Sequence, residues 1–186
     1  MKLNGFFALI ISLVMGIPNA TAQNSSQVSV VQEQYQVPLL KGKENNPFIR
    51  IKLVVSGNRE IAVSGFQFSL KGTTSLQDLQ QLTLYYFKKD SIVNGSLDFS
   101  KARVFGSVNS INNKVTINGE QLLDPGTHYF WLSCTLMPNA NALHEADASC
   151  TQVSTGDRRI KPAPESKNIQ QKFAVALRKQ HDDNVN

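Results

Sequence analysis

The chain has 186 residues, of which 41% are hydrophobic and 18% are charged. These proportions are typical of one globular domain with terminal extensions, and they exclude a disordered or fibrous protein. The net charge is +5, but Lys and Arg are scattered, and their densest clusters are the pairs Lys88-Lys89 and Arg158-Arg159. With no basic helix face and no aromatic RNA-binding motif, the sequence predicts no nucleic-acid partner.

The amino terminus has the features of a secretory signal peptide. Lys2 supplies a short positive region, residues 6–16 form an apolar run, and Ala20-Thr21-Ala22 is a small-residue cleavage site. We expect residues 1–22 to be removed after Ala22 and the mature protein to be secreted or periplasmic. The apolar run is shorter than the roughly 20 residues that a spanning helix requires, so we expect no membrane span in the mature form.

Residues 23–156 are predicted to form an antiparallel β-sandwich. Apolar and polar residues alternate in residues 48–55 and again in 61–70, and these two strands are expected to pair as a hairpin through Gly57-Asn58. A single helical turn is expected at residues 75–80. The remaining predicted strands are residues 81–87, 104–110, 114–117, 128–136 and 148–154.

Short turn signals separate these strands. Asn94-Gly95 and Asn118-Gly119 are strong turn dipeptides, Asn112-Asn113 is a weaker one, and Asp124-Pro125-Gly126 precedes the most apolar strand. About eight short strands joined by short turns indicate an all-β sandwich of the jelly-roll or immunoglobulin-like type.

Residues 157–186 are predicted to be a linker and the lead-in to a further domain. Charge and proline dominate from Asp157, which indicates a linker or a strap along the domain surface. Residues 173–186 then change from apolar to charged with no turn or cap after them. We expect this tail to be disordered or loosely strapped where its partner domain is missing, with apolar surface left exposed.

Two cysteines, Cys134 and Cys150, leave two alternatives open. In an oxidising compartment they could form a disulfide, which would stabilise the fold by about 3 kcal/mol in the chain-entropy model. Cys134 also lies on an apolar strand face, which is equally typical of a buried free thiol.

No pattern in the sequence predicts a metal or a cofactor. His128, His144 and His181 lie far apart without the spacing of a zinc site, and Glu145 with Asp147 supply too few oxygen ligands for calcium. There is no Gly-x-Ser-x-Gly nucleophile motif and no phosphate-binding glycine loop.

Several short segments have a specific order and spacing. They include Asn46-Pro47-Phe48, Leu84-Tyr85-Tyr86 and residues 66–74, 125–133, 147–150 and 176–184. Together they resemble the amino-terminal domain of bacterial exo-α-sialidases, and the resemblance covers nearly all of the mature chain.

The resemblance implies a sandwich that precedes a six-bladed catalytic propeller, which releases terminal sialic acid. In that family an arginine cluster, beginning in a Tyr-Arg-Ile-Pro motif, grips the sialic acid carboxylate. A tyrosine nucleophile with a glutamate, and an aspartate acid/base, complete the family's chemistry. No position of this sequence matches those motifs, so we assign no catalytic residue and expect no hydrolysis by this chain alone.

Four aromatic residues are candidates for a sugar or inter-domain contact: Tyr85, Tyr86, Tyr129 and Trp131. One hypothesis is a structural module that packs against the propeller and orients it. The alternative is a carbohydrate-binding module on whose rings sugars stack. Tyr85 and Tyr86 point to opposite sides of their strand, so at most one can join the main core, and the other is the better contact candidate. Trp131 is expected in the core or at a domain interface.

Overall fold

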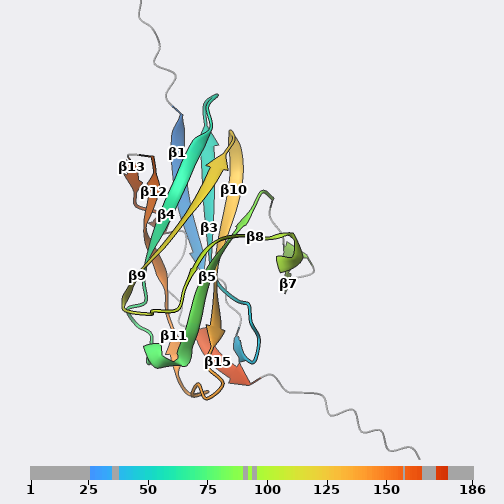
Figure 1. The fold of residues 1–186 in the computed structure, drawn as a ribbon, viewed down its shortest axis with the longest axis vertical. Helices are drawn as coiled ribbons and strands as arrows, with labels where there is room; N and C mark the ends of the chain where they lie inside the picture. The colour runs from blue at the N-terminus through green and yellow to red at the C-terminus, as the bar shows by residue number, and fades with distance from the viewer. Residues whose placement is uncertain are drawn as a thin grey trace, which may run out of the picture.

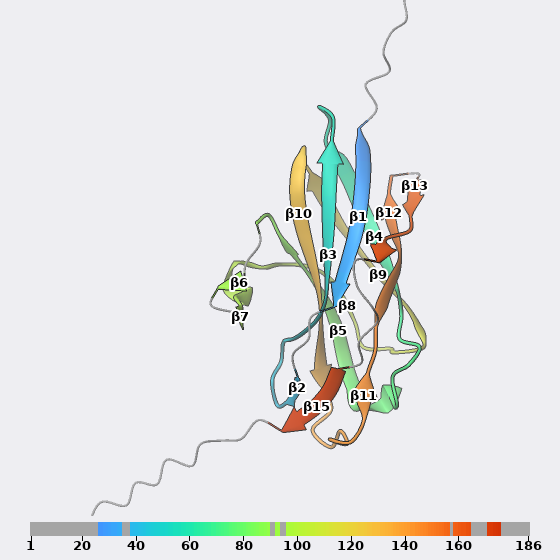
Figure 2. The same cartoon turned by 180° about the vertical axis from the view of Figure 1, so that it is seen from behind.

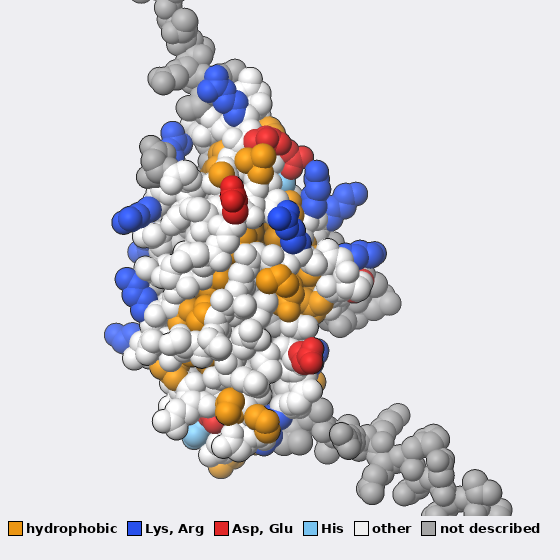
Figure 3. Space-filling model, viewed as in Figure 1, with side chains coloured by type: hydrophobic (Ala, Val, Ile, Leu, Met, Phe, Trp, Pro, Cys, Tyr) orange, Lys and Arg blue, Asp and Glu red, His pale blue; other side chains and the backbone are white. Residues whose placement is uncertain are grey.

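The structure, a computed structural model, describes residues 26–34, 38–89, 92–93, 96–156, 158–164 and 171–175; for 92, 93, 96, 164 and 171–175 only the backbone is described. Two long twisted sheets lie face to face, with their strands along the long axis of the molecule (Figures 1 and 2). The predicted all-β sandwich is therefore confirmed. The predicted signal peptide, residues 1–22, lies outside the described residues. On the face of the molecule shown in Figure 3, Lys and Arg side chains are spread out and do not gather in one patch.

The larger sheet has six strands and the smaller one has four. In spatial order the larger sheet contains β14 (Ala163–Pro164), β1 (Gln27–Gln34), β3 (Asn46–Ser56), β10 (Gly126–Leu136), β5 (Leu79–Phe87) and β8 (Arg103–Val108). The smaller sheet contains β13 (Arg158–Ile160), β12 (Ser149–Thr155), β4 (Ile61–Ser69) and β9 (Lys114–Leu123). Neighbouring strands are antiparallel except β1 and β14, which run parallel.

Two small sheets complete the described structure. At the lower end in Figure 1, β15 (Gln171–Val175) lies between β11 (Glu145–Ala146) and β2 (Leu39–Lys41). To the side of the larger sheet, β6 (Ile92–Val93) pairs with β7 (Ser96–Leu97). Two short 3-10 helices, η1 (Leu76–Asp78) and η2 (Phe99–Lys101), lie in the connections, and η1 occupies the predicted helical turn.

The main core lies between the two sheets, where alternate residues of each strand point inward. Phe66 of β4 is 1% exposed and contacts two rings of the opposite sheet. Its ring centroid is 4.7 Å from that of Phe130 in β10 and 5.3 Å from that of Phe105 in β8. Truncating a buried phenylalanine of this kind to alanine costs about 3–5 kcal/mol of stability. These three rings therefore make a large contribution to holding the sheets together.

The predicted hairpin between residues 48–55 and 61–70 is wrong. β3 pairs with β1 and β10 in the larger sheet, whereas β4 pairs with β12 and β9 in the smaller one. Both strands have one buried face, and this alternation is the same for strands that lie side by side as for strands that face each other across a core. The turn at Gly57, whose φ of 109° favours glycine, carries the chain from one sheet to the other.

The predicted turn at Asn118-Gly119 is also wrong, because both residues lie inside β9. The register opposite β4 shifts here, as at a β-bulge. The glycine is required for another reason: a β-carbon on Gly119 would overlap the carbonyl oxygen of Phe105 in β8. Equally, a β-carbon on Gly106 would overlap the carbonyl oxygen of Asn118. The two backbones thus meet along one edge of the sandwich.

The chain after Gly156 contributes strands that the sequence did not predict. β13 extends the smaller sheet, and β14 lies beside β1 in the larger one, so this segment straps across both sheets. The tail is a strand as far as Val175, since Phe173 to Val175 pair with Leu39 to Lys41; residues 176–186 lie outside the described residues. β1 and β2 were not predicted either. The other predicted strands are present with shifted bounds, and Asn94-Gly95 lies outside the described residues.

The close approach of β8 and β9 gives a stability prediction. Alanine in place of Gly119 or Gly106 should lower the free energy of unfolding by about 1–3 kcal/mol, since backbone atoms must move to admit the methyl group. Urea unfolding, followed by the fluorescence of the single tryptophan, measures this. Ser107→Ala, at an exposed site next to Gly106 in β8, is the control. Equal midpoints for the glycine variants and the control would contradict the crossing.

Candidate functional site

The outer face of the larger sheet carries a second hydrophobic cluster, separate from the main core. Adjacent strands assemble it, because Tyr129 in β10 is opposite Phe87 in β5 and Trp131 is opposite Tyr85. The excursion between β5 and β8 adds Leu97 and further side chains. The cluster contains Phe87, Leu97 and Trp131, all buried, and the partly buried Tyr85, Phe99, Ala102 and Tyr129.

Trp131 and Tyr129 belong to this cluster and do not form an open platform. Trp131 is 0% exposed, and Tyr129 is partly buried. The guanidinium carbon of Arg50 lies 5.7 Å from the ring centroid of Tyr129 and 5.8 Å from that of Trp131. Arg50 also forms an ion pair with Glu33 of the neighbouring strand. A cation held against two rings stabilises the cluster.

Tyr86 points to the other side of β5, as the alternation predicts, and packs against the main core. Its hydroxyl lies 2.9 Å from Nδ1 of His128, a buried histidine. Nε2 of that ring lies 2.8 Å from the carbonyl oxygen of Asp124, which can only accept, so Nε2 carries the proton. His128 therefore has polar partners at both nitrogens. Burial, with Asp124 nearby, raises the pKa of Tyr86.

Tyr85 lies on the outer face beside a polar hollow of about 410 Å³. The turn between β2 and β3 forms one wall of the hollow, and the start of β5 with the end of β10 forms the other. Seven residues line it: Glu44, Asn45, Gln80, Gln81, Thr83, Tyr85 and Thr135. Of the four aromatic candidates, only Tyr85 lines this hollow.

Asn46 fixes the turn that walls the hollow. The side chain is buried, and its Oδ1 accepts the Leu40 N–H at 2.7 Å. Its Nδ2 lies within 3.2 Å of the carbonyl oxygens of Leu40, Lys43 and Cys134. One amide thus ties both ends of the turn to β10. Sequence reasoning did not find this role, and the only local signal is a polar residue directly before Pro47 and an apolar strand.

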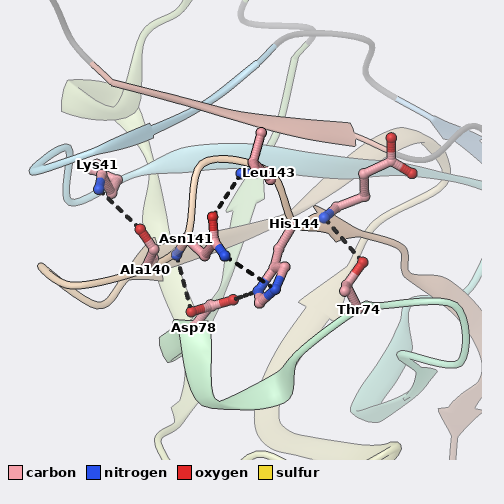
Figure 4. A network of polar contacts seen from close by, with 8 residues as sticks. Lys41, Thr74, Asp78, Ala140, Asn141, Leu143 and His144 are labelled. Atoms are coloured by element: carbon pink, nitrogen blue, oxygen red, sulfur yellow. Dashed lines mark hydrogen bonds and ion pairs between the residues drawn. The ribbon is translucent and has the colours of Figure 1, made fainter.

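A second polar network braces the lower end of the molecule (Figure 4). Asp78 in η1 is buried, and its Oδ2 lies 2.6 Å from Nδ1 of His144. Its Oδ1 accepts the Asn141 N–H at 3.3 Å. From β2, Nζ of Lys41 donates to the carbonyl oxygen of Ala140 at 2.9 Å. The loop of residues 137–145 is thereby held from two sides. Leu143 in this loop is 88% exposed.

Cys134 and Cys150 are both buried free thiols in the structure. Cys134 lies in β10 of the larger sheet and Cys150 in β12 of the smaller one. Burial raises the pKa of each thiol to about 12. Both side chains are therefore protonated core residues at neutral pH.

Within the described ranges, no three His, Cys, Asp or Glu side chains converge as a metal site requires. The same part of the chain contains no helix long and apolar enough to cross a membrane. Glu145 and Asp147, which were weighed as calcium ligands, are held in place through their backbones. The backbone N–H of each is bonded to a threonine hydroxyl, that of Thr74 for Glu145 and that of Thr73 for Asp147.

The fold and these sites define a two-sheet β-sandwich domain with one aromatic and polar outer face. Residues 26–159 match the family model described as the N-terminal domain of BNR-repeat neuraminidase. The chain belongs to this family.

Two relatives are longer proteins. A sialidase of Bacteroides fragilis (strain YCH46) is 19% identical in an alignment of 177 residues that covers 84% of this chain and 32% of that protein. The solved structure of Hadza microbial sialidase Hz136 superposes with a TM-score of 0.66 at 18% identity, covering 76% of this chain and 30% of that one. The chain therefore spans about a third of the length of these relatives.

The raised thiol pKa values predict that neither cysteine reacts with thiol reagents in the folded state. A pKa of about 12 leaves roughly one thiolate in 10⁴ at pH 8, so a thiol reagent should not label the native protein. Unfolding in guanidinium without reductant should expose two reactive thiols per chain. Finding none after unfolding would show that the two cysteines are joined by a disulfide.

Proposed function

We propose that this chain is the non-catalytic N-terminal module of a secreted sialidase, and that it packs against and orients a catalytic propeller that cleaves terminal sialic acid from glycoconjugates. Membership of the family over residues 26–159 supports the first part. The two relatives are sialidases of which this chain covers about a third, which leaves room in such proteins for a further domain. Hydrolysis is assigned to that domain, not to this chain.

The observation that carries the orienting role is the position of β15. This strand is paired on both sides, with Phe173 opposite Leu39 of β2 and Lys172 opposite Glu145 of β11. Because two neighbouring strands hold β15, its last residue, Val175, has a fixed position. Whatever follows Val175 therefore starts from a defined position, which a flexible linker would not provide.

The braced loop at the same end supports a packing contact. The loop of residues 137–145 ends at the first residue of β11, the neighbour of β15. Asp78 and Lys41 hold the loop, so Leu143 is presented on a prearranged backbone. A leucine that is 88% exposed beside β15 is suited to burial against a following domain, because the loop is already ordered.

Hydrogen exchange tests this packing role in the sialidase polypeptide in which the module is joined to its catalytic domain. Amides of residues 137–145 should exchange more slowly there than in residues 1–186 alone, since the following domain covers them. Leu143→Asp should remove the added protection. The turn of residues 57–60, at the opposite end of the sandwich, is the internal control. Identical exchange of the loop with and without the catalytic domain would contradict the proposal.

A further inference from the structure

The polar hollow beside Tyr85 is formed by an irregularity in β5. Gln81 is opposite Thr135 of β10, but Leu79 is opposite the next residue, Leu136, so Gln80 is an extra residue in β5. A bulge of this kind redirects side chains, and here Gln80 and Gln81 are both exposed. Two consecutive amides thus reach the outer face at one point.

Alternation then places Thr83 and Tyr85 on the same face as Gln81. The hydroxyl of Tyr85 donates to Oδ1 of Asn45 at 2.6 Å, across the hollow from β5 to the turn. The hydroxyl of Thr135 donates to the carbonyl oxygen of Glu44 at 2.6 Å. Asn46 also fixes the turn, so the protein's own hydrogen bonds tie both walls together. The polar groups are therefore prearranged.

The hollow also has one apolar wall, the ring of Tyr85. This ring meets Phe99 edge to face, with centroids 4.8 Å apart, and belongs to the outer cluster that Trp131 anchors. Its orientation is thus set by packing. A pyranose presents hydroxyl groups around its rim and C–H groups on its faces, so it matches amides and hydroxyls that surround one aromatic wall.

The negative charge of Glu44 in the hollow favours neutral sugars over acidic ones. Of the seven lining residues, Glu44 alone carries a formal charge. Burial, followed by the charge of Glu44, raises the pKa of Tyr85, so the negative field of this carboxylate extends to the far wall. A sugar carboxylate placed there would face like charge, whereas neutral hydroxyl groups can donate to Glu44.

We propose that the hollow is a binding subsite for a neutral saccharide and that Glu44 disfavours acidic sugars. The volume of about 410 Å³ lies within the range of about 300–1,000 Å³ that is typical of small-molecule sites. This inference goes beyond the packing role and does not depend on it, because it concerns the outer face of the larger sheet in the chain by itself.

An NMR titration of the ¹⁵N-labelled chain tests the subsite with two matched probes. Lactose is neutral, and 3′-sialyllactose differs from it by one acidic sugar. Lactose should produce saturable shifts in the amides of Glu44, Asn45, Gln81 and Thr135, with an association constant at least threefold above that of 3′-sialyllactose. No saturable shift at these residues, or tighter binding of 3′-sialyllactose there, would overturn the proposal.

Variants distinguish the hollow from nonspecific binding. Gln81→Ala, an exposed change that leaves the core intact, should weaken lactose binding at least threefold. Gln121→Ala on β9 of the other sheet is the matched control and should leave binding unchanged. Glu44→Gln should narrow the difference between the two probes by improving binding of 3′-sialyllactose. Equal affinities for all three variants and the parent would place binding elsewhere and refute the assignment.

Discussion

Contact between the two sheets through aromatic side chains is the constraint on which the other features depend. Phe66 reaches across the sandwich to Phe130 and Phe105, and Tyr86 meets Phe130 from the neighbouring strand. At the edge formed by β8 and β9 no side chain separates the sheets, and the backbones meet through Gly106 and Gly119. The two sheets are thus held apart where aromatic rings fill the core, and their backbones touch where the two glycines lie. This arrangement fixes β5 and β10 firmly in the larger sheet.

Because β5 and β10 are fixed by their inward residues, their outward residues are fixed as well. Phe130 enters the main core, and its neighbour Trp131 anchors the outer cluster. In the same way, Tyr86 packs against the main core and its neighbour Tyr85 joins the outer cluster. The polar hollow inherits this rigidity, since its far wall is β5 itself and its near wall is a turn held by the buried Asn46. A prearranged site of this kind lowers the entropy lost on binding.

Much of the fold could be predicted from the alternation of apolar and polar residues along the chain. The predictions that were wrong have physical causes. The pattern in residues 128–136 predicts both the strand and the opposite placement of neighbouring side chains. The same pattern cannot say whether residues 48–55 and 61–70 lie side by side or face to face, and in the structure they face each other. Asn118-Gly119 has the composition of a tight turn, but its glycine serves a contact with Phe105 that is invisible in sequence. The bulge in β5 and the buried amide of Asn46 bring Glu44, Gln81 and Thr135 together around the hollow. No local sequence pattern predicts this arrangement.

The position of β15, the braced loop and the family match together support the proposal that this chain is a front module from which a catalytic domain continues. The nucleotide sequence that follows the Asn186 codon in the source genome tests this account most directly. We predict that it encodes, in the same or an adjacent frame, a propeller with a Tyr-Arg-Ile-Pro motif and aspartate boxes. A stop codon followed by unrelated sequence would contradict the account and leave a free-standing β-sandwich.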